Sequence, residues 1–235
     1  MVSAVAFLTI VGRGTTPDAR TMRWFPAVGL LLGAVVGGVW WLADAAFAPF
    51  LAAALAVATD LLLTGMLHVD GLADSADGLL PHVDRDRRLA IMAQPDIGAF
   101  GVTAIGIALL LRVGALASMP VDIGLVAGLW CASRSAMALV ATTRPYARAG
   151  GGLASAFLGD RSTPAIAAAG VVAGGVVAAA STGRAGAAAA LALVAAVAAV
   201  VALADRRLGG FTGDVLGAVG VVGETVGLVV AAAKW

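Results

Sequence analysis

Long apolar stretches recur along this chain and restrict its fold more than any other feature. Seven of them lie at about 25–43, 48–67, 99–117, 122–143, 163–181, 185–204 and 213–233. A helix needs roughly 20 apolar residues to cross a hydrocarbon core of about 30 Å. Charged residues make up only 12% of the chain, against roughly 25% in soluble domains. The sequence therefore predicts an all-α, polytopic membrane bundle of about seven transmembrane helices, forming a single domain over residues 1–235.

The first 24 residues do not fit this pattern. Residues 2–11 are apolar, but about ten residues are too few to cross a bilayer, so an interfacial or re-entrant segment is predicted. No basic leader with a small-residue cleavage site precedes the first span, so the N-terminus is interpreted as mature and not as a signal peptide.

Basic residues are distributed unevenly between the two sides of the predicted bundle. With a cytoplasmic N-terminus, only Arg184 and Lys234 would lie outside. The cytoplasmic side would carry Arg13, Arg20, Arg23, Arg85, Arg87, Arg88, Arg144, Arg148, Arg161, Arg206 and Arg207. Because cytoplasmic loops are enriched in Lys and Arg, a cytoplasmic N-terminus and chemistry on that face are predicted. Expected partners are the lipid bilayer and a phosphorylated substrate, not a nucleic acid.

A cluster of acidic residues follows the second span. Asp70, Asp74 and Asp77 have the spacing i, i+4 and i+7, which places them on one face of a helix, and His68 lies one turn before Leu72. A divalent cation would relieve their mutual repulsion. Oxygen ligands favour Mg²⁺, with Mn²⁺ as an alternative and Zn²⁺ left open through His68. A solvated acidic loop is the competing interpretation.

The continuity of the second span decides what lies beside this cluster. If its helix continued through residue 77, Asp60 and Thr64 would lie on an adjoining strip. Gly65, Gly71 and Gly78 weaken helix propensity and would instead mark turns.

Two further polar segments lie on the predicted cytoplasmic side. The glycine-rich run 209–213 leads into the last span, so its backbone N–H groups could bind phosphate at a helix N-terminus; a simple turn is the alternative. Arg144 and Arg148 either bind phosphate or anchor a helix end at the interface.

Four charges within the spans need partners or a wet cavity, because an unpaired charge in a bilayer is costly. They are Asp60, Arg112, Arg134 and Glu224, and Arg112 with Glu224 is one expected pair. Small residues on the first and last spans indicate close helix packing and would also permit a homo-oligomer. Cys131 is alone, so no disulfide within the chain is expected.

Several motifs follow one another along the chain. The first runs from Leu63-Thr64-Gly65 through His68-Val69-Asp70-Gly71-Leu72-Ala73-Asp74 to Asp77-Gly78. The others are Asp84-Arg85-Asp86-Arg87 with Ile91-Met92 and Gly98, then Ser133-Arg134, Arg144-Pro145-Tyr146-Ala147-Arg148, and the segment 208–218. Together they resemble the cobalamin synthase family, the adenosylcobinamide-GDP ribazoletransferases of bacteria, over nearly the whole chain.

The resemblance implies a phosphotransfer to α-ribazole or its 5′-phosphate. A ribose hydroxyl would attack the cobinamide-side phosphorus of adenosylcobinamide-GDP, and GMP would leave. It implies Asp70, Asp74, Asp77 and Asp214 as Mg²⁺ ligands, Asp214 alternatively contacting the ribose, and His68, Asp70 or Asp74 as the group that takes the proton. The candidate substrate-binding residues are Asp60, Arg134, Arg144, Arg148, Gly210, Thr212 and Gly213.

The chain departs from the family pattern in places. Gln94 and Val221 stand where acidic residues are expected, and Arg112 stands where Lys is expected. Two other classes remain open from the residues alone: a membrane enzyme that transfers a phosphoalcohol from a CDP-activated lipid, and a transporter. The first lacks its usual Ala-Arg pair here, and short, featureless outer loops disfavour the second.

Overall fold

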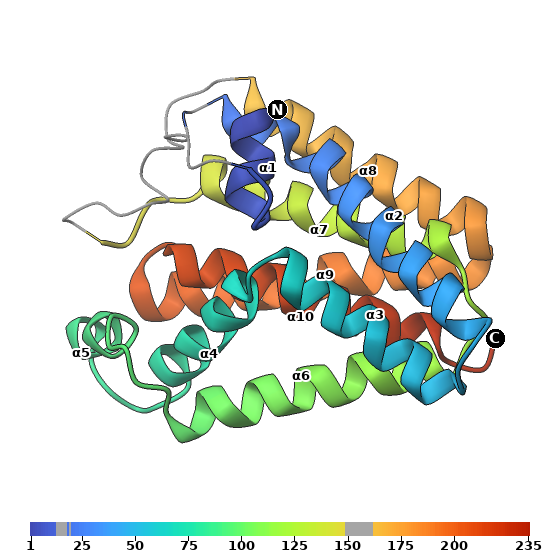
Figure 1. Cartoon of the computed structure of the whole chain (residues 1–235). Coiled ribbons are helices and arrows are strands. Elements are labelled where there is room, and N and C mark those ends of the chain that lie inside the picture. Colours follow the sequence, from blue (N-terminus) through green and yellow to red (C-terminus); the bar gives the residue numbers. More distant parts are fainter. Residues whose placement is uncertain (13–17, 19, 149–161) are drawn as a thin grey trace.

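The computed structural model describes residues 1–12, 18, 20–148 and 162–235, and these are almost entirely helical (Figure 1). Within this part of the chain there is no strand, only one isolated parallel bridge between Tyr146 and Phe211. The elements are α1 (Val2–Leu8), η1 (Thr21–Trp24), α2 (Phe25–Asp44), α3 (Pro49–Leu63), α4 (Leu67–Leu79), α5 (Arg85–Ile91), α6 (Ala99–Ala117), α7 (Ile123–Thr143), α8 (Thr163–Thr182), α9 (Arg184–Leu208) and α10 (Gly213–Ala231).

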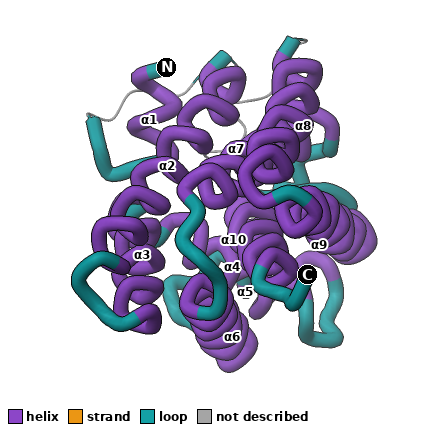
Figure 2. The backbone as a smooth tube through the Cα atoms, turned by 90° about the vertical axis from the view of Figure 1, so that its right-hand side faces the viewer, coloured by secondary structure: helices purple, strands orange, loops and turns teal. Residues whose placement is uncertain are grey.

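In the described part of the chain, six helices are long and apolar enough to cross a membrane, and α3 with α4 gives a seventh span if that bent pair crosses once. The six are η1 with α2, α6, α7, α8, α9 and α10. The predicted all-α bundle of about seven spans is therefore confirmed. α7 and α10 are mostly buried and lie in the middle, with the other helices around them (Figure 2).

The second span does not continue through the acidic cluster. α3 ends at Leu63, and α4 leaves it at an angle of 88°. Gly65 and Met66 adopt left-handed backbone angles, with φ of +57° and +61°, and no helix continues through two such residues. The arrangement in which Asp60 shares a helix with Asp70 is thus wrong, and the turn at Gly65 is the alternative that holds.

The glycine stripe of α2 packs against α7. A Cβ atom at Gly29 would lie 2.6 Å from the Trp130 carbonyl oxygen, and one at Gly33 would lie 2.7 Å from Ala127 Cα. The helices approach this closely only because both positions lack a side chain. Close packing within the chain, predicted for this stripe, is confirmed.

The N-terminal segment forms the short helix α1, which has seven residues and so is too short to cross a bilayer. Ala4 and Leu8 are fully buried, and the Phe7 ring stacks on Phe25 with centroids 6.0 Å apart. The end of the bundle where α1, α4 and α5 lie (left in Figure 1) is called the site end below.

Candidate functional site

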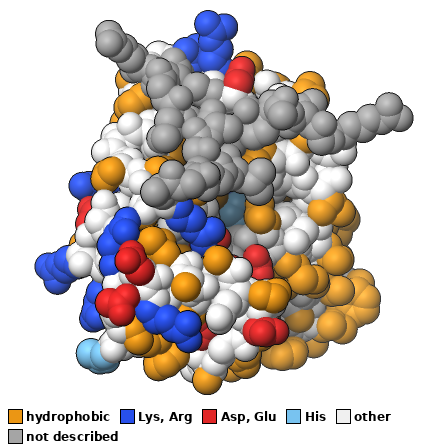
Figure 3. Space-filling model, turned by 90° about the vertical axis from the view of Figure 1, so that its left-hand side faces the viewer, with side chains coloured by type: hydrophobic (Ala, Val, Ile, Leu, Met, Phe, Trp, Pro, Cys, Tyr) orange, Lys and Arg blue, Asp and Glu red, His pale blue; other side chains and the backbone are white. Residues whose placement is uncertain are grey.

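A cavity of about 280 Å³ opens at the site end, between α4, the start of α10 and the segment that follows α7. Its walls contain five of the predicted site residues, which come from three separate motifs. The lining residues are Phe7, Leu67, His68, Asp70, Gly71, Met137, Tyr146, Arg148, Gly213, Asp214, Leu216 and Gly217. Basic and acidic side chains gather on this face of the molecule, while one flank is hydrophobic (Figure 3).

The segment after α7 is joined to the loop before α10 by two backbone hydrogen bonds. Ala147 N–H donates to the Phe211 carbonyl at 2.8 Å, and Phe211 N–H donates to Pro145 at 2.9 Å. Gly210 has a φ of +159°, and a Cβ atom there would lie 2.1 Å from the Pro145 carbonyl oxygen. Only glycine fits at this position, so Gly210 allows the two segments to meet. Gly210 is not among the residues that line the cavity.

Thr212 and Gly213 begin α10. The Thr212 hydroxyl accepts the Val215 N–H at 3.3 Å, which caps the helix, and donates to Asp214 Oδ2 at 3.1 Å. Thr212 is fully buried, whereas Gly213 is exposed and has open space beside its Cα. The open face at Gly213 suits the predicted approach of a phosphate, which stays a prediction.

Arg148 connects this helix start to the opposite wall. Its Nη2 lies 2.9 Å from Asp214 Oδ2 and donates to the Met92 carbonyl at 3.2 Å. Beside it, burial raises the pKa of Tyr146 and outweighs the opposite effect of Arg148, so the phenol keeps its proton at neutral pH. Among the described lining residues Arg148 is the cation, and it lies beside the start of α10.

The acidic residues of α4 face α10 across a tight helix crossing. A Cβ atom at Gly71 would lie 2.8 Å from the Asp214 carbonyl oxygen, and one at Gly217 would lie 2.9 Å from that of His68. This crossing places Asp70 and Asp74 within electrostatic range of Asp214. Among the described residues no three His, Cys, Asp or Glu side chains are close enough together to form a complete metal site.

Asp77 has partners of its own. Its Oδ2 accepts the Gly98 N–H at 2.7 Å, and its Oδ1 accepts the Gly101 N–H at 3.0 Å. The carboxylate thus satisfies backbone donors at the start of α6. The structure gives Asp77 a capping function that its position in the acidic cluster did not predict.

His68 is almost completely buried in the cavity wall, with 4% of its surface exposed. Neither ring nitrogen has a hydrogen-bond partner among the described residues. Buried polar groups nearly always have a partner, so these two nitrogens point to a ligand.

Asp60 and Arg134 lie outside this cavity, in a buried chain of charges. Arg112 Nη1 lies 2.9 Å from Asp60 Oδ2, and Arg112 Nη2 lies 2.5 Å from Glu224 Oε2. Glu224 also pairs with Arg134, and the Trp130 indole donates to Asp60 Oδ1 at 2.8 Å. The expected pair of Arg112 with Glu224 is confirmed. The contacts seen for Asp60 and Arg134 are with these neighbours, and their binding of substrate is only a prediction.

Arg144 also lies away from the cavity wall. Its Nη1 is 3.3 Å from Asp205 Oδ2, and its side chain is 49% exposed. This contact resembles the surface anchor that was the alternative to phosphate binding.

Two arginines of α5 have functions that the sequence did not reveal. Arg85 donates through Nε to the Leu208 carbonyl at 2.8 Å and through Nη2 to that of Ala147 at 2.6 Å, so it holds both loops of the site. Arg88 is buried and donates to the carbonyls of Gly78 and Leu79 at 2.9 and 2.8 Å. Burial lowers the pKa of Arg88. The sequence signal that could have indicated these functions is the i, i+3 spacing of Arg85 and Arg88 after Asp84, the N-cap residue of α5.

The Gly71 crossing gives a direct test of the site. Replacing Gly71 by Ala should lower the thermal stability of the detergent-solubilised protein and reduce turnover by about tenfold, because the new methyl group meets backbone and not a movable side chain. Gly106→Ala is the matched control, since its Cβ has nothing within 4 Å. Equal behaviour of the two variants would show that the α4–α10 contact does not shape the site.

The cobalamin-5-phosphate synthase family model matches residues 1–232 of the chain. An adenosylcobinamide-GDP ribazoletransferase of Chlorobaculum tepidum is 36% identical over 234 residues, covering 93% of this chain and 89% of the relative. One of Bradyrhizobium diazoefficiens is 38% identical over 242 residues, covering 98% and 92%. One of Novosphingobium aromaticivorans is 50% identical over 105 residues, covering 44% and 42%. No solved structure matches the chain.

Proposed function

Because the chain belongs to the cobalamin-5-phosphate synthase family, we propose that it is an adenosylcobinamide-GDP ribazoletransferase and catalyses the final assembly step of cobalamin. The substrates are adenosylcobinamide-GDP and α-ribazole or its 5′-phosphate, and the products are GMP and adenosylcobalamin or its phosphate. The observation that carries this proposal is the cavity itself. It unites His68 and Asp70, Arg148, and Gly213 and Asp214, which belong to three of the motifs that resemble the family.

In the proposed reaction, a ribose hydroxyl oxygen forms a bond to the cobinamide-side phosphorus. The bond from that phosphorus to the bridging oxygen breaks, and GMP leaves with this oxygen. His68 takes the hydroxyl proton, since its ring nitrogens have no other partner among the described residues. Arg148 and the backbone N–H groups after Gly213 hold the charged phosphate oxygens.

The donors around the cavity fit a magnesium ion. Mg²⁺ takes oxygen ligands and is usually held by one or two carboxylates together with substrate phosphates and water. One or two of the carboxylates of Asp70, Asp74 and Asp214 would hold it, because the three are not close enough together to form a complete site. Asp77 is left out because its oxygens already accept backbone N–H groups. A bound Mg²⁺, or Mn²⁺, would neutralise charge that develops on the pyrophosphate.

The activity can be tested with the purified, detergent-solubilised protein. Given adenosylcobinamide-GDP and α-ribazole, we expect GMP and adenosylcobalamin in equal amounts with Mg²⁺ and neither product with EDTA. CMP release from a CDP-activated alcohol would instead support the lipid phosphotransferase class. A folded sample that releases no nucleotide with Mg²⁺ or Mn²⁺ would contradict the proposed reaction.

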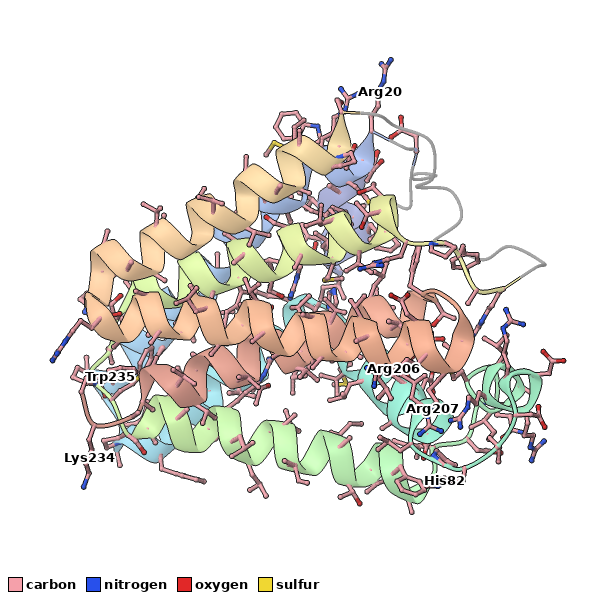
Figure 4. All side chains as sticks on the ribbon, turned by 180° about the vertical axis from the view of Figure 1, so that it is seen from behind. Arg20, His82, Arg206, Arg207, Lys234 and Trp235 are labelled. Atoms are coloured by element: carbon pink, nitrogen blue, oxygen red, sulfur yellow. The ribbon has the colours of Figure 1, made fainter. Side chains whose placement is uncertain are left out.

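The apolar helices make this a multi-pass membrane protein, and we propose that its site end faces the cytoplasm. Arg20, Arg206 and Arg207 lie at that end, whereas Lys234 lies at the other (Figure 4). Positive charge marks the cytoplasmic side. Arg13 and Arg161, which entered the same prediction, lie outside the described residues.

Cysteine labelling tests this orientation, because the single native cysteine, Cys131, is buried. In intact cells, a membrane-impermeant maleimide should label a cysteine placed at Lys234 and leave one placed at His82 unlabelled until the membrane is opened. The reverse pattern would place the cavity outside.

A homo-oligomer is also a proposal. The stripe of Gly29 and Gly33 faces α7 within the chain, and Gly217 faces α4. An oligomer would therefore use other surfaces than the small-residue stripes that first suggested it, and the mass of the protein in detergent would reveal it.

A further inference from the structure

The size of the site cavity restricts which part of the reaction it can hold. A molecule occupies roughly 14 Å³ of van der Waals volume per non-hydrogen atom, so an open cavity of about 280 Å³ has the scale of a ligand of about 20 such atoms and not of one several times larger. α-Ribazole has about 20 non-hydrogen atoms, GDP has about 28, and a corrinoid has more than about 60. The cavity therefore has room for the acceptor nucleoside and is too small for the whole donor.

The cavity wall has an apolar part that suits a flat heteroaromatic ring. This part is formed by α1, the first residue of α4, α7 and α10, and its side chains are Phe7, Leu67, Met137 and Leu216. The Tyr146 ring adds a second aromatic surface and is held edge-to-face against Phe211 at 5.4 Å. Apolar and aromatic walls with a few polar groups are typical of small-molecule sites, and aromatic rings pack well on one another.

Charge favours an uncharged ligand in the same space. Asp70 and Asp214 are acidic, and the cation among the lining residues, Arg148, already pairs with Asp214 at 2.9 Å. Without a metal ion, a pyrophosphate placed deep inside would bring its charges against these carboxylates, whereas a nucleoside brings only hydroxyl groups. The pyrophosphate of the donor fits better at the open edge of the cavity, beside the exposed Gly213.

His68 supplies an independent sign of a ligand. Its ring is buried in the wall, and neither nitrogen has a hydrogen-bond partner among the described residues. A ribose hydroxyl can both donate to and accept from such a ring.

We propose that this cavity is the acceptor pocket, which binds the benzimidazole nucleoside with its flat base against the apolar wall and its ribose toward His68 and Asp70. The corrinoid and its GDP lie outside, at the mouth of the cavity, with the pyrophosphate near Gly213. This inference rests on the proposed function, since it assigns one of its two substrates to a place. The attacking hydroxyl then approaches the phosphorus from within the protein, and GMP leaves toward the outside.

A substitution that fills the cavity separates the two substrates. Leu67 is 43% exposed, so a larger side chain can be accommodated there without repacking the core. We expect Leu67→Trp to raise KM for α-ribazole at least tenfold and to change KM for adenosylcobinamide-GDP less than twofold. Leu62→Trp is the matched control, because Leu62 is exposed and does not line the cavity. A rise in the donor KM alone, or no change in either, would overturn the acceptor pocket while leaving the proposed reaction intact.

Binding without turnover gives a second readout. In EDTA and without donor, calorimetric titration should show α-ribazole binding to the wild type, weakened at least tenfold by Leu67→Trp, and GDP should not displace it. Absence of α-ribazole binding, displacement by GDP, or equal binding to the variant would overturn the inference, even if the wild type shows no turnover. If Leu67→Trp does not fold, Phe7→Ala removes another part of the apolar wall and should raise the acceptor KM about fivefold. An unchanged KM would count against the pocket.

Discussion

Asp74→Asn should reduce turnover of adenosylcobinamide-GDP by roughly 100- to 1,000-fold or more, the range found when one group that stabilises a charged transition state is removed. Asp74 is partly buried on α4 and interacts electrostatically with Asp214 and Asp70. The described part of the chain offers it no hydrogen bond or ion pair. Asn has the same shape, so the fold should be unchanged, and what is lost is the charge that would hold a metal ion. Activity and thermal unfolding of the purified protein give the two readouts.

Asp77→Asn is the informative partner of this variant. The Gly98 and Gly101 N–H groups bond to different oxygens of Asp77, and Asn replaces one of these oxygens with an NH₂ group that cannot accept. We expect a loss of about 1–3 kcal/mol in stability, as for other buried donors left without an acceptor. The Asp74 hypothesis is lost if Asp74→Asn keeps near-normal activity with saturating Mg²⁺, or if it unfolds as readily as Asp77→Asn.

Glu224→Gln should destabilise the protein more than Asp77→Asn does, with a loss of about 3–5 kcal/mol, the cost of leaving a buried ion pair without one partner. Glu224 is 1% exposed and bonds to both Arg112 and Arg134. Without its charge, Asp60 alone would balance two arginines inside the membrane bundle. The thermal midpoint and the yield of monodisperse protein in detergent measure the effect.

A second substitution tests whether charge balance is the cause. Arg134→Gln together with Glu224→Gln leaves only the pair of Asp60 with Arg112, so the double variant should be more stable than Glu224→Gln alone. Asp205→Asn is the surface control, because its contact with Arg144 is half exposed and should be worth less than about 1 kcal/mol. If Glu224→Gln unfolds no earlier than this control, the buried charges do not hold the bundle together.

The spans could be predicted because hydropathy alone restricts them. The pairing of Arg112 with Glu224 could be predicted for a related reason: a charge inside a bilayer needs a partner, and few residues qualify. The end of α3 was harder to place, since it depends on Met66, a residue that rarely adopts a left-handed conformation. Gly65 gave only a hint of it.

Within the site, residue type predicted chemistry better than position did. The motifs identified His68, Asp70, Arg148, Gly213 and Asp214, and these line one cavity. The motifs could not show that Asp77 caps another helix or that Arg85 joins two loops, because such contacts link residues far apart in the chain and depend on how the helices pack. The same limit hid the apolar wall, whose side chains carry no chemical signal in the sequence.

The buried chain of charges has a consequence for how the protein is made. Helices of a growing chain emerge in order, and α10 is the last of the described helices, yet it occupies the middle of the bundle (Figure 2). Until it arrives, Arg134 lacks the carboxylate of Glu224, and the loop before α10 is absent from the site. The earlier helices must therefore assemble around a polar and incompletely packed centre until α10 inserts between them. The insertion of α10 thus completes the site, and a chain interrupted before α10 would be inserted but inactive.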